Sequence, residues 1–314
     1  MPISFRHIQP TEKRREAPAG VGGARERGNR TDQVRQLSMP TPEDAKQRAA
    51  FTYNAAADVF DDLPLSFWAY FGKKTVDKLS LQTGARVLDV CCGSGASAIP
   101  AAEVVGLSGS VIGVDLADKL LALARAKAEH RALQNITFRC ADMLAMDYPA
   151  ESFDAVICVF GIFFVPDMSG AVRELWRFVR PGGKLAITTW GPNVLEPANG
   201  AFWQAVLKVR SDLYKAFNPW DRISDPESLR QMLQEGGVDP EEVTTENRWH
   251  PLNSHEDWWT IALGSGYRGT IEQLSATERV AVREANLTFI RDYGIVRLEA
   301  NALYAVATKK ASIQ

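Results

Sequence analysis

Long apolar segments are missing from this chain of 314 residues. The longest apolar run, Ala155–Val165, is far shorter than the roughly 20 residues that a membrane-spanning helix needs, and the N-terminus lacks the apolar core of a signal peptide. An excess of one charge is missing too. The formal net charge is −2, which gives no whole-chain electrostatic reason to bind nucleic acid or an anionic membrane. These absences predict a cytoplasmic protein with no membrane span and no nucleic-acid partner.

Cysteine is scarce, with four residues, two of which are adjacent. This number does not make a disulfide framework, and the spacing matches no zinc-binding pattern. The four lie at or near predicted strand ends: Cys91, Cys92, Cys140 and Cys158. A metal or arsenic site there competes with the simpler interpretation of small, buried apolar side chains. We favour the second interpretation and predict no metal.

The N-terminal segment differs in composition from the rest of the chain. Met1–Arg48 holds ten Lys or Arg against six Asp or Glu and shows no apolar period. Residues 1–45 are therefore predicted to be a disordered basic tail, with a basic arm that contacts a partner as the alternative. The remaining length and the 46% hydrophobic content suit one large α/β domain, with or without a small cap.

Apolar runs and helical segments alternate after a helix-start signal at Thr41–Asp44. Helices are predicted at Phe51–Phe60 and Leu65–Leu79. The predicted strands are Arg86–Val90, Ser110–Val114, Ile136–Cys140, Phe153–Phe160 and, after a turn at Arg180–Gly183, Lys184–Trp190. The helices between them are Ala96–Val105, Ala117–Arg131 and Gly170–Val179. Continuous apolar strands that alternate with helices indicate an α/β fold with a parallel sheet covered on both faces.

The regular alternation ends beyond Trp190. The predicted elements there are helices at Ala201–Phe217 and Asp225–Glu235, a strand near Val243–Trp249, a helical segment Ser254–Asp292 and a last strand Ala302–Thr308. We therefore expect a core of residues 46–253 and 296–314, with residues 254–295 inserted as a helical cap. Six of the eight tryptophans lie between Trp190 and Trp259, where they either line an apolar pocket or pack the core.

The most informative segment is Val87–Ala96, with the sequence VLDVCCGSGA. A predicted strand ends in an acid and continues through Gly93-Ser94-Gly95 into a helix. Glycines at such a turn let the backbone approach a ligand, and the new helix presents unpaired N–H groups to it. The next strand ends in Asp115, which is placed to accept two ribose hydroxyl protons, as in dinucleotide-binding folds. The six-residue GxGxxG pattern is absent, because position 91 is Cys and position 98 is Ala. A nucleoside without a pyrophosphate is therefore preferred over NAD.

Five segments follow one another at suitable spacing: VLDVCCGSG, VIGVDLAD, CADMLAMDYP, FDAVICVF and RPGGKLAITTW. Together they resemble the ordered motifs of class I S-adenosylmethionine-dependent methyltransferases, most of all the small-molecule branch that includes ubiquinone and menaquinone C-methyltransferases. The resemblance covers roughly Thr52–Trp190, and more loosely Ser224–Trp249 and Ala302–Thr308. It implies a Rossmann-like, doubly wound, mostly parallel seven-stranded sheet whose last strand runs antiparallel, with a helical cap. It also implies methyl transfer from S-adenosylmethionine to the O, N or C atom of a small-molecule acceptor.

The resemblance assigns cofactor-binding roles to thirteen residues. It gives the methionine end to Asp89 and to the turn residues Cys91, Cys92, Gly93, Ser94 and Gly95. It implies that Asp115 binds the ribose hydroxyls, that Leu116 contacts the adenine face and that Asp142, with Met143, binds the adenine amino group. It also implies that Val159 and Phe160 flank the sulfonium. The segment YNAAADVFDD resembles the family's first-helix motif, which implies that Tyr53 closes over the cofactor. Cys91 departs from the family pattern, because many members carry Gly there.

No general base is evident from the sequence, so the catalytic residues stay open. His250 and His255 flank a loop after a late strand, and each is either a base or a surface or structural histidine. The aromatic residues after the strands either line the acceptor site or pack the core: Phe163, Phe164 and Trp190.

Two other function classes compete with a small-molecule methyltransferase. A macromolecular methyltransferase is disfavoured because FDAVICVF is followed by GIFFVPDM and not by the Asn/Asp-Pro-Pro-aromatic motif that similar amino-methylating enzymes of nucleic acids carry. In addition, no basic stripe lies beyond the tail. A non-catalytic protein that binds the cofactor is compatible with every motif. The acceptor and the oligomeric state stay open.

Overall fold

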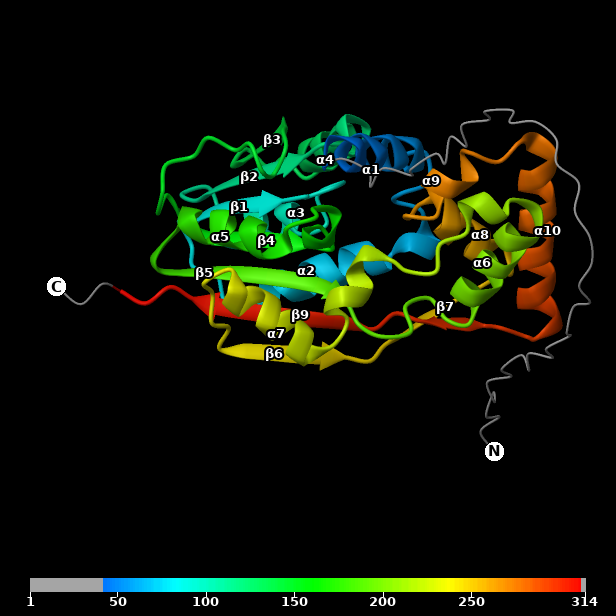
Figure 1. Cartoon of the computed structure of the whole chain (residues 1–314). Coiled ribbons are helices and arrows are strands. Elements are labelled where there is room, and N and C mark those ends of the chain that lie inside the picture. Colours follow the sequence, from blue (N-terminus) through cyan, green and yellow to red (C-terminus); the bar gives the residue numbers. More distant parts are fainter. Residues whose placement is uncertain (1–41, 312–314) are drawn as a thin grey trace, which may run out of the picture. The chain divides into compact units, whose positions relative to one another are not determined.

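A seven-stranded sheet organises the part of the chain that the structure describes, residues 42–311 of a computed structural model. Its strand order is β3-β2-β1-β4-β5-β9-β6 (Figure 1). All neighbouring strands are parallel except in the two pairs made by β9, which runs antiparallel between β5 and β6. The expected mostly parallel, seven-stranded Rossmann-like sheet is confirmed. The predicted tail over residues 1–45 lies, except for its last few positions, outside the described residues.

The strands of this sheet are β1 (Arg86–Val90), β2 (Ser110–Asp115), β3 (Ile136–Cys140), β4 (Phe153–Val159), β5 (Val179–Trp190), β6 (Glu242–Glu246) and β9 (Ala302–Thr308). Residues 87–90 of β1 and 155–158 of β4 are fully buried, which explains why these strands are apolar without alternation. The strand order reverses between β1 and β4, because the chain first builds outward through β2 and β3 and then returns. Ligands of open α/β sheets bind beyond the carboxyl ends of the strands at such a reversal.

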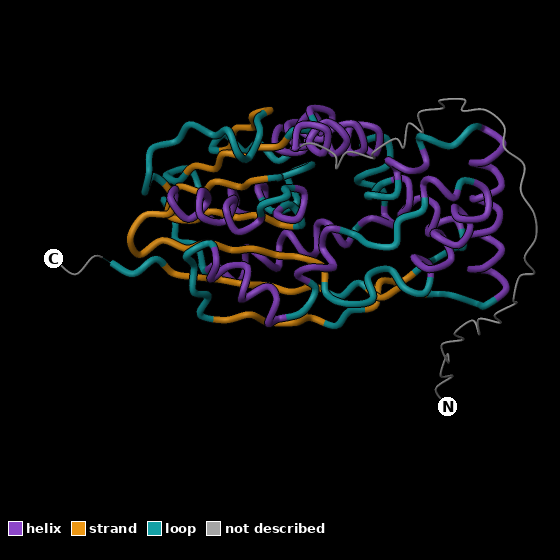
Figure 2. Tube along the Cα trace, in the orientation of Figure 1, coloured by secondary structure: helices purple, strands orange, loops and turns teal. Residues whose placement is uncertain are grey.

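The helices are α1 (Pro42–Ala56), α2 (Phe67–Leu79), α3 (Ala98–Val105), α4 (Asp118–His130), α5 (Met168–Phe178), α6 (Ala198–Val209), α7 (Pro226–Glu235), α8 (Glu256–Leu263), α9 (Arg268–Ile271) and α10 (Ala276–Asp292). Side-chain caps set several starts. Asp167 Oδ1 accepts the Gly170 N–H at 2.8 Å at the start of α5, and Ser275 forms a capping box with Glu278 at the start of α10. Figure 2 shows α6 and α8–α10 grouped beyond one end of the sheet.

Several predicted boundaries are wrong. The helix expected at Phe51–Phe60 ends at Ala56, and the helix expected at Ala201–Phe217 ends at Val209 and is followed by short 3-10 turns. The turn expected at Arg180–Gly183 lies inside β5, where the register with β4 shifts between Phe153 and Ala155. A register shift of this kind absorbs the irregular backbone of Pro and Gly without ending the strand.

A second, two-stranded sheet was not expected. It pairs β7 (Trp249–Pro251) with β8 (Arg297–Glu299) on either side of α8–α10 in the sequence. The residues expected as one strand, Val243–Trp249, therefore belong to two sheets. The domain boundaries predicted from the sequence, including the cap over residues 254–295, stay predictions.

Candidate cofactor site

The turn after β1 begins the candidate site. Cys91, Gly93 and Gly95 have φ angles of +57°, +52° and +85°, and the Gly95 N–H donates to the Cys92 carbonyl at 2.8 Å. Glycine adopts this left-handed region without cost, whereas Cys91 is strained there by about 1–2 kcal/mol. Three left-handed residues in five curl the backbone tightly between β1 and α3.

Asp115, at the end of β2, holds this turn in place. Its Oδ2 accepts the N–H of Gly93 and its Oδ1 accepts the N–H of Ala117, each at 2.8 Å. Burial raises the pKa of Asp115 above its ordinary value, while the backbone N–H groups oppose that shift. A carboxylate has about four acceptor sites, so each oxygen keeps one for a further donor. Asp115 is thus both the anchor of the turn and an acceptor for a ligand.

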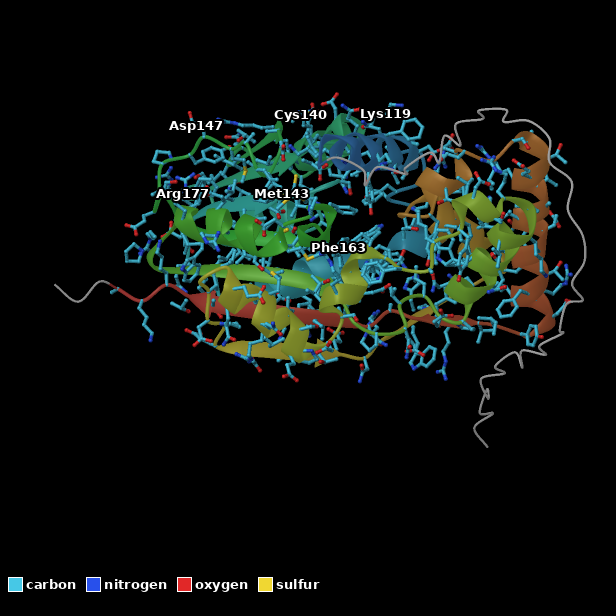
Figure 3. The ribbon with its side chains drawn as sticks, viewed as in Figure 1. Lys119, Cys140, Met143, Asp147, Phe163 and Arg177 are labelled. Carbon is cyan, nitrogen blue, oxygen red and sulfur yellow. The ribbon has the colours of Figure 1, made fainter. Side chains whose placement is uncertain are left out.

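The turn and Asp115 border a cavity of about 990 Å³, counting the part open to solvent. The cavity brings together eleven of the thirteen residues predicted from the sequence: Tyr53, Cys91, Cys92, Gly93, Ser94, Asp115, Leu116, Asp142, Met143, Val159 and Phe160. Met143 and Cys140, which ends β3, are labelled in Figure 3.

Asp89 and Gly95 are the two predicted residues that do not line the cavity. Asp89 is fully buried, and its Oδ2 accepts the hydroxyl proton of Ser97 at 2.7 Å, at the N-terminus of α3. Burial raises its pKa to about 7, opposed by the Ser97 hydrogen bond. Its Oδ1 has no hydrogen-bond partner within residues 42–311. The geometry therefore places Ser97, which does line the cavity, between Asp89 and a ligand.

Helix α1 forms one wall of the cavity. Lys46, Ala49, Ala50 and Tyr53 all line it, and their spacing of three, four and seven residues places them on one helix face. Of these, the sequence predicted only Tyr53. The helical spacing of the small residues Ala49 and Ala50 with respect to Tyr53 is the signal that could have identified them. Lys46 forms an ion pair with Asp142 across the cavity rim.

Aromatic rings form another wall. Phe60, Trp68, Phe160 and Phe164 line the cavity. Phe60 stacks on Trp68, with ring centres 5.5 Å apart and planes 7° from parallel, and Tyr53 meets Phe164 edge-on at 5.5 Å. Phe60 is the aromatic residue of the first-helix motif, which was given a role only for Tyr53, and Trp68 was missed because nothing local distinguishes it from a core aromatic residue.

The other aromatic candidates lie behind this wall. Trp190 does not line the cavity but stacks on Phe160 at 4.1 Å, and Phe163, labelled in Figure 3, packs against Trp220 at 5.5 Å. None of the six tryptophans from Trp190 to Trp259 lines the cavity, so their enrichment reflects packing.

Burial holds the cysteine and tyrosine side chains of the cavity in their neutral forms. A hydrogen bond with Cys158 and burial raise the pKa of the Cys91 thiol, and burial raises that of Tyr53 well above its ordinary value. Neither candidate histidine lines the cavity. His250 is buried against the Pro64 carbonyl at 2.8 Å, where burial lowers its pKa, and His255 is exposed.

Residues 42–311 contain no group of three or more His, Cys, Asp or Glu side chains placed to hold a metal ion. No helix within the same residues has the length and apolar content needed to cross a membrane.

Comparisons with known proteins agree with this geometry. Residues 87–183 match the family model described as a methyltransferase domain. The chain is 35% identical over 144 residues to aklanonic acid methyltransferase DauC of Streptomyces sp. (strain C5), a match that covers 46% of this chain and 66% of that protein. It is 32% identical over 179 residues to the demethylmenaquinone methyltransferase of Listeria welshimeri, covering 52% of this chain and 75% of the relative. The crystal structure of the YcgJ protein of Bacillus subtilis has a similar fold, with a TM-score of 0.53 at 18% identity over 77% of this chain and all of that one.

Proposed function

Because the chain belongs to the family of class I S-adenosylmethionine-dependent methyltransferases, we propose that it transfers a methyl group from S-adenosylmethionine to a small-molecule acceptor. The observation that carries this proposal is the position of Asp115. Its carboxylate fixes the glycine-rich turn and lies at the border of the cavity, where it can accept further hydrogen bonds. Vicinal ribose hydroxyls are the donors that such a carboxylate binds in Rossmann-like folds.

The residues around Asp115 fit the rest of the cofactor. Leu116 and Met143 supply apolar surface for a base, and Asp142 supplies an acceptor for an exocyclic amino group. The aromatic wall suits the sulfonium, because ring faces attract a cation while excluding water. We therefore propose cofactor contacts for the eleven predicted residues that line the cavity, and an indirect role through Ser97 for Asp89.

This chain's residues would act mainly by alignment. When bound, S-adenosylmethionine would supply an electrophilic methyl group to an acceptor lone pair, with S-adenosylhomocysteine as the leaving group and the acceptor's proton released to solvent. The wall of Phe60, Trp68, Phe160 and Phe164 holds an apolar acceptor and keeps water out.

The acceptor class rests on the aromatic wall and on the relatives. Both curated relatives are named for small organic acceptors, aklanonic acid and demethylmenaquinone. We propose an acceptor of this general kind, a small and largely apolar molecule, with the cofactor as the second partner. A large polar macromolecule fits an apolar cavity wall less well.

Two measurements test the proposal. Calorimetry is expected to show saturable binding of S-adenosylmethionine and none of NAD; the reverse result would refute it. Mass spectrometry of a panel of phenols, quinones and amines is then expected to show products heavier by one methyl group, only when protein and cofactor are both present. Cofactor binding with no methylated product from the panel or from cell extract would favour the non-catalytic alternative.

A further inference from the structure

The base end of the cavity has two walls from distant parts of the chain. Ala49 and Ala50 of α1 line the same cavity as Leu116 and Met143, which follow β2 and β3. The small alanine side chains leave the space between the helix and the sheet edge open as part of this cavity. Helix α1 is therefore part of the base site as well as a cover over the cofactor.

One ion pair joins these walls at the rim. Lys46 Nζ contacts Asp142 Oδ2, while Asp142 Oδ1 accepts the Leu144 N–H at 2.9 Å. The Lys46 and Asp142 side chains are 26% and 17% exposed, so the pair is partly shielded from solvent. With one donor on each oxygen, the carboxylate keeps acceptor sites for an amino group in the plane of a bound base. The lysine and the Leu144 N–H together fix where those sites point.

We propose that Lys46 is a positioning residue for the cofactor's base, which orients the Asp142 carboxylate toward the adenine amino group and closes α1 on the ring. The inference rests on the proposed function and extends it, because that function assigns α1 only the contact of Tyr53. It makes α1 a part of cofactor recognition through charge, beyond the contact of Tyr53.

Other contacts hold α1 independently of Lys46. Asn54 Oδ1 accepts the backbone N–H of Lys119 at 2.9 Å, at the start of α4. Asp58, just after α1, pairs with Arg268 of α9 at 3.0 Å. A change at Lys46 therefore leaves the helix attached at two other places, and its effect on ligand binding can be separated from unfolding.

A double-mutant cycle on the full chain tests the proposal. Calorimetry measures the Kd of S-adenosylhomocysteine for the wild type, Lys46→Met, Asp142→Asn and the double variant. Lys46→Met is expected to weaken binding about five- to tenfold, the size typical of a partly shielded charge pair. In the Asp142→Asn background the same change is expected to weaken binding less than about twofold, because the group that Lys46 positions is already altered.

Two more variants separate positioning from general stabilisation. Lys46→Arg is expected to keep most of the affinity, because it keeps the positive charge on the same helix face. Lys119→Met removes an exposed lysine near α1 (Figure 3) and is expected to bind like the wild type. Equal losses from Lys46→Met in both backgrounds, or no loss in either, would overturn the proposal while the cofactor site stands. If the wild type binds no S-adenosylhomocysteine, the proposed function fails, and this inference fails with it.

Discussion

Replacing Asp115 with Asn keeps the size of the side chain but removes its charge and one acceptor. In the free protein both carboxylate oxygens accept a backbone N–H at 2.8 Å, from Gly93 and Ala117. An amide has one oxygen, so in either orientation its NH₂ group faces one of those two N–H groups, and it offers the ribose a donor where the carboxylate offered an acceptor. The substitution therefore affects the turn and the ligand contact together.

The size of the effect follows from the bonds that are lost. Hydrogen bonds to a charged group contribute about 1.5–3 kcal/mol, so loss of one ribose bond weakens cofactor binding roughly ten- to a few-hundredfold. In the free protein the mismatched backbone N–H destabilises the fold, but burial already raises the pKa of Asp115 and so disfavours its charged form. These effects oppose each other, and we expect the melting temperature to shift by only a few degrees.

Calorimetry with S-adenosylhomocysteine is the assay, and Asp118→Asn is the control. Asp118 lies three residues further on, its side chain is 71% exposed, and its partner Arg125 is 3.6 Å away. This variant is expected to bind like the wild type. Asp115→Glu should lose less affinity than Asp115→Asn, because it keeps two acceptor oxygens. Equal affinity of the wild type and Asp115→Asn would refute the ribose contact.

Three further predictions concern stability. Burial raises the pKa of Asp89 to about 7, so the folded state holds its proton more tightly than the unfolded state does. The free energy of unfolding, measured with urea, is therefore expected to fall by a few kcal/mol as the pH rises from about 4 to about 7. Asp89→Asn is expected to flatten that pH profile. Gly161→Ala would place a Cβ 2.4 Å from the Cys91 Cβ, so it should destabilise the fold by about 1–3 kcal/mol in denaturant melts. Adding Cys91→Gly, which removes this Cβ and also relieves the left-handed strain, should recover part of that loss. Removing residues 1–38, which lie outside the described part of the chain, should change neither the melting temperature nor cofactor affinity, because their sequence has no apolar period; a fall of several degrees would contradict this.

The sequence predicts the sheet and the turn well because their signals are local. Strands β1 and β9 have the expected bounds, since a largely apolar run that is buried on both sides needs no distant information. The wall from α1 was missed apart from Tyr53, because the pairing of Lys46 with Asp142 joins residues nearly a hundred positions apart. The direction of the Asp89 side chain depends on how α3 begins at Ser97, which a motif does not specify.

The place of β9 in the sheet has a consequence for how the protein is synthesised. Strand β5 pairs with β4 on one edge and with residues 302–308 of β9 on the other. Strand β6 pairs with β9 as well. A nascent chain that has emerged as far as residue 300 therefore has one unpaired edge on β5 and no partner at all for β6, and such unpaired strands are templates for aggregation. The cavity-lining residues, 46–165, have all been made by then. We therefore expect the aggregation of the ribosome-bound chain to depend more on how soon β9 is synthesised than on early binding of a nucleoside ligand.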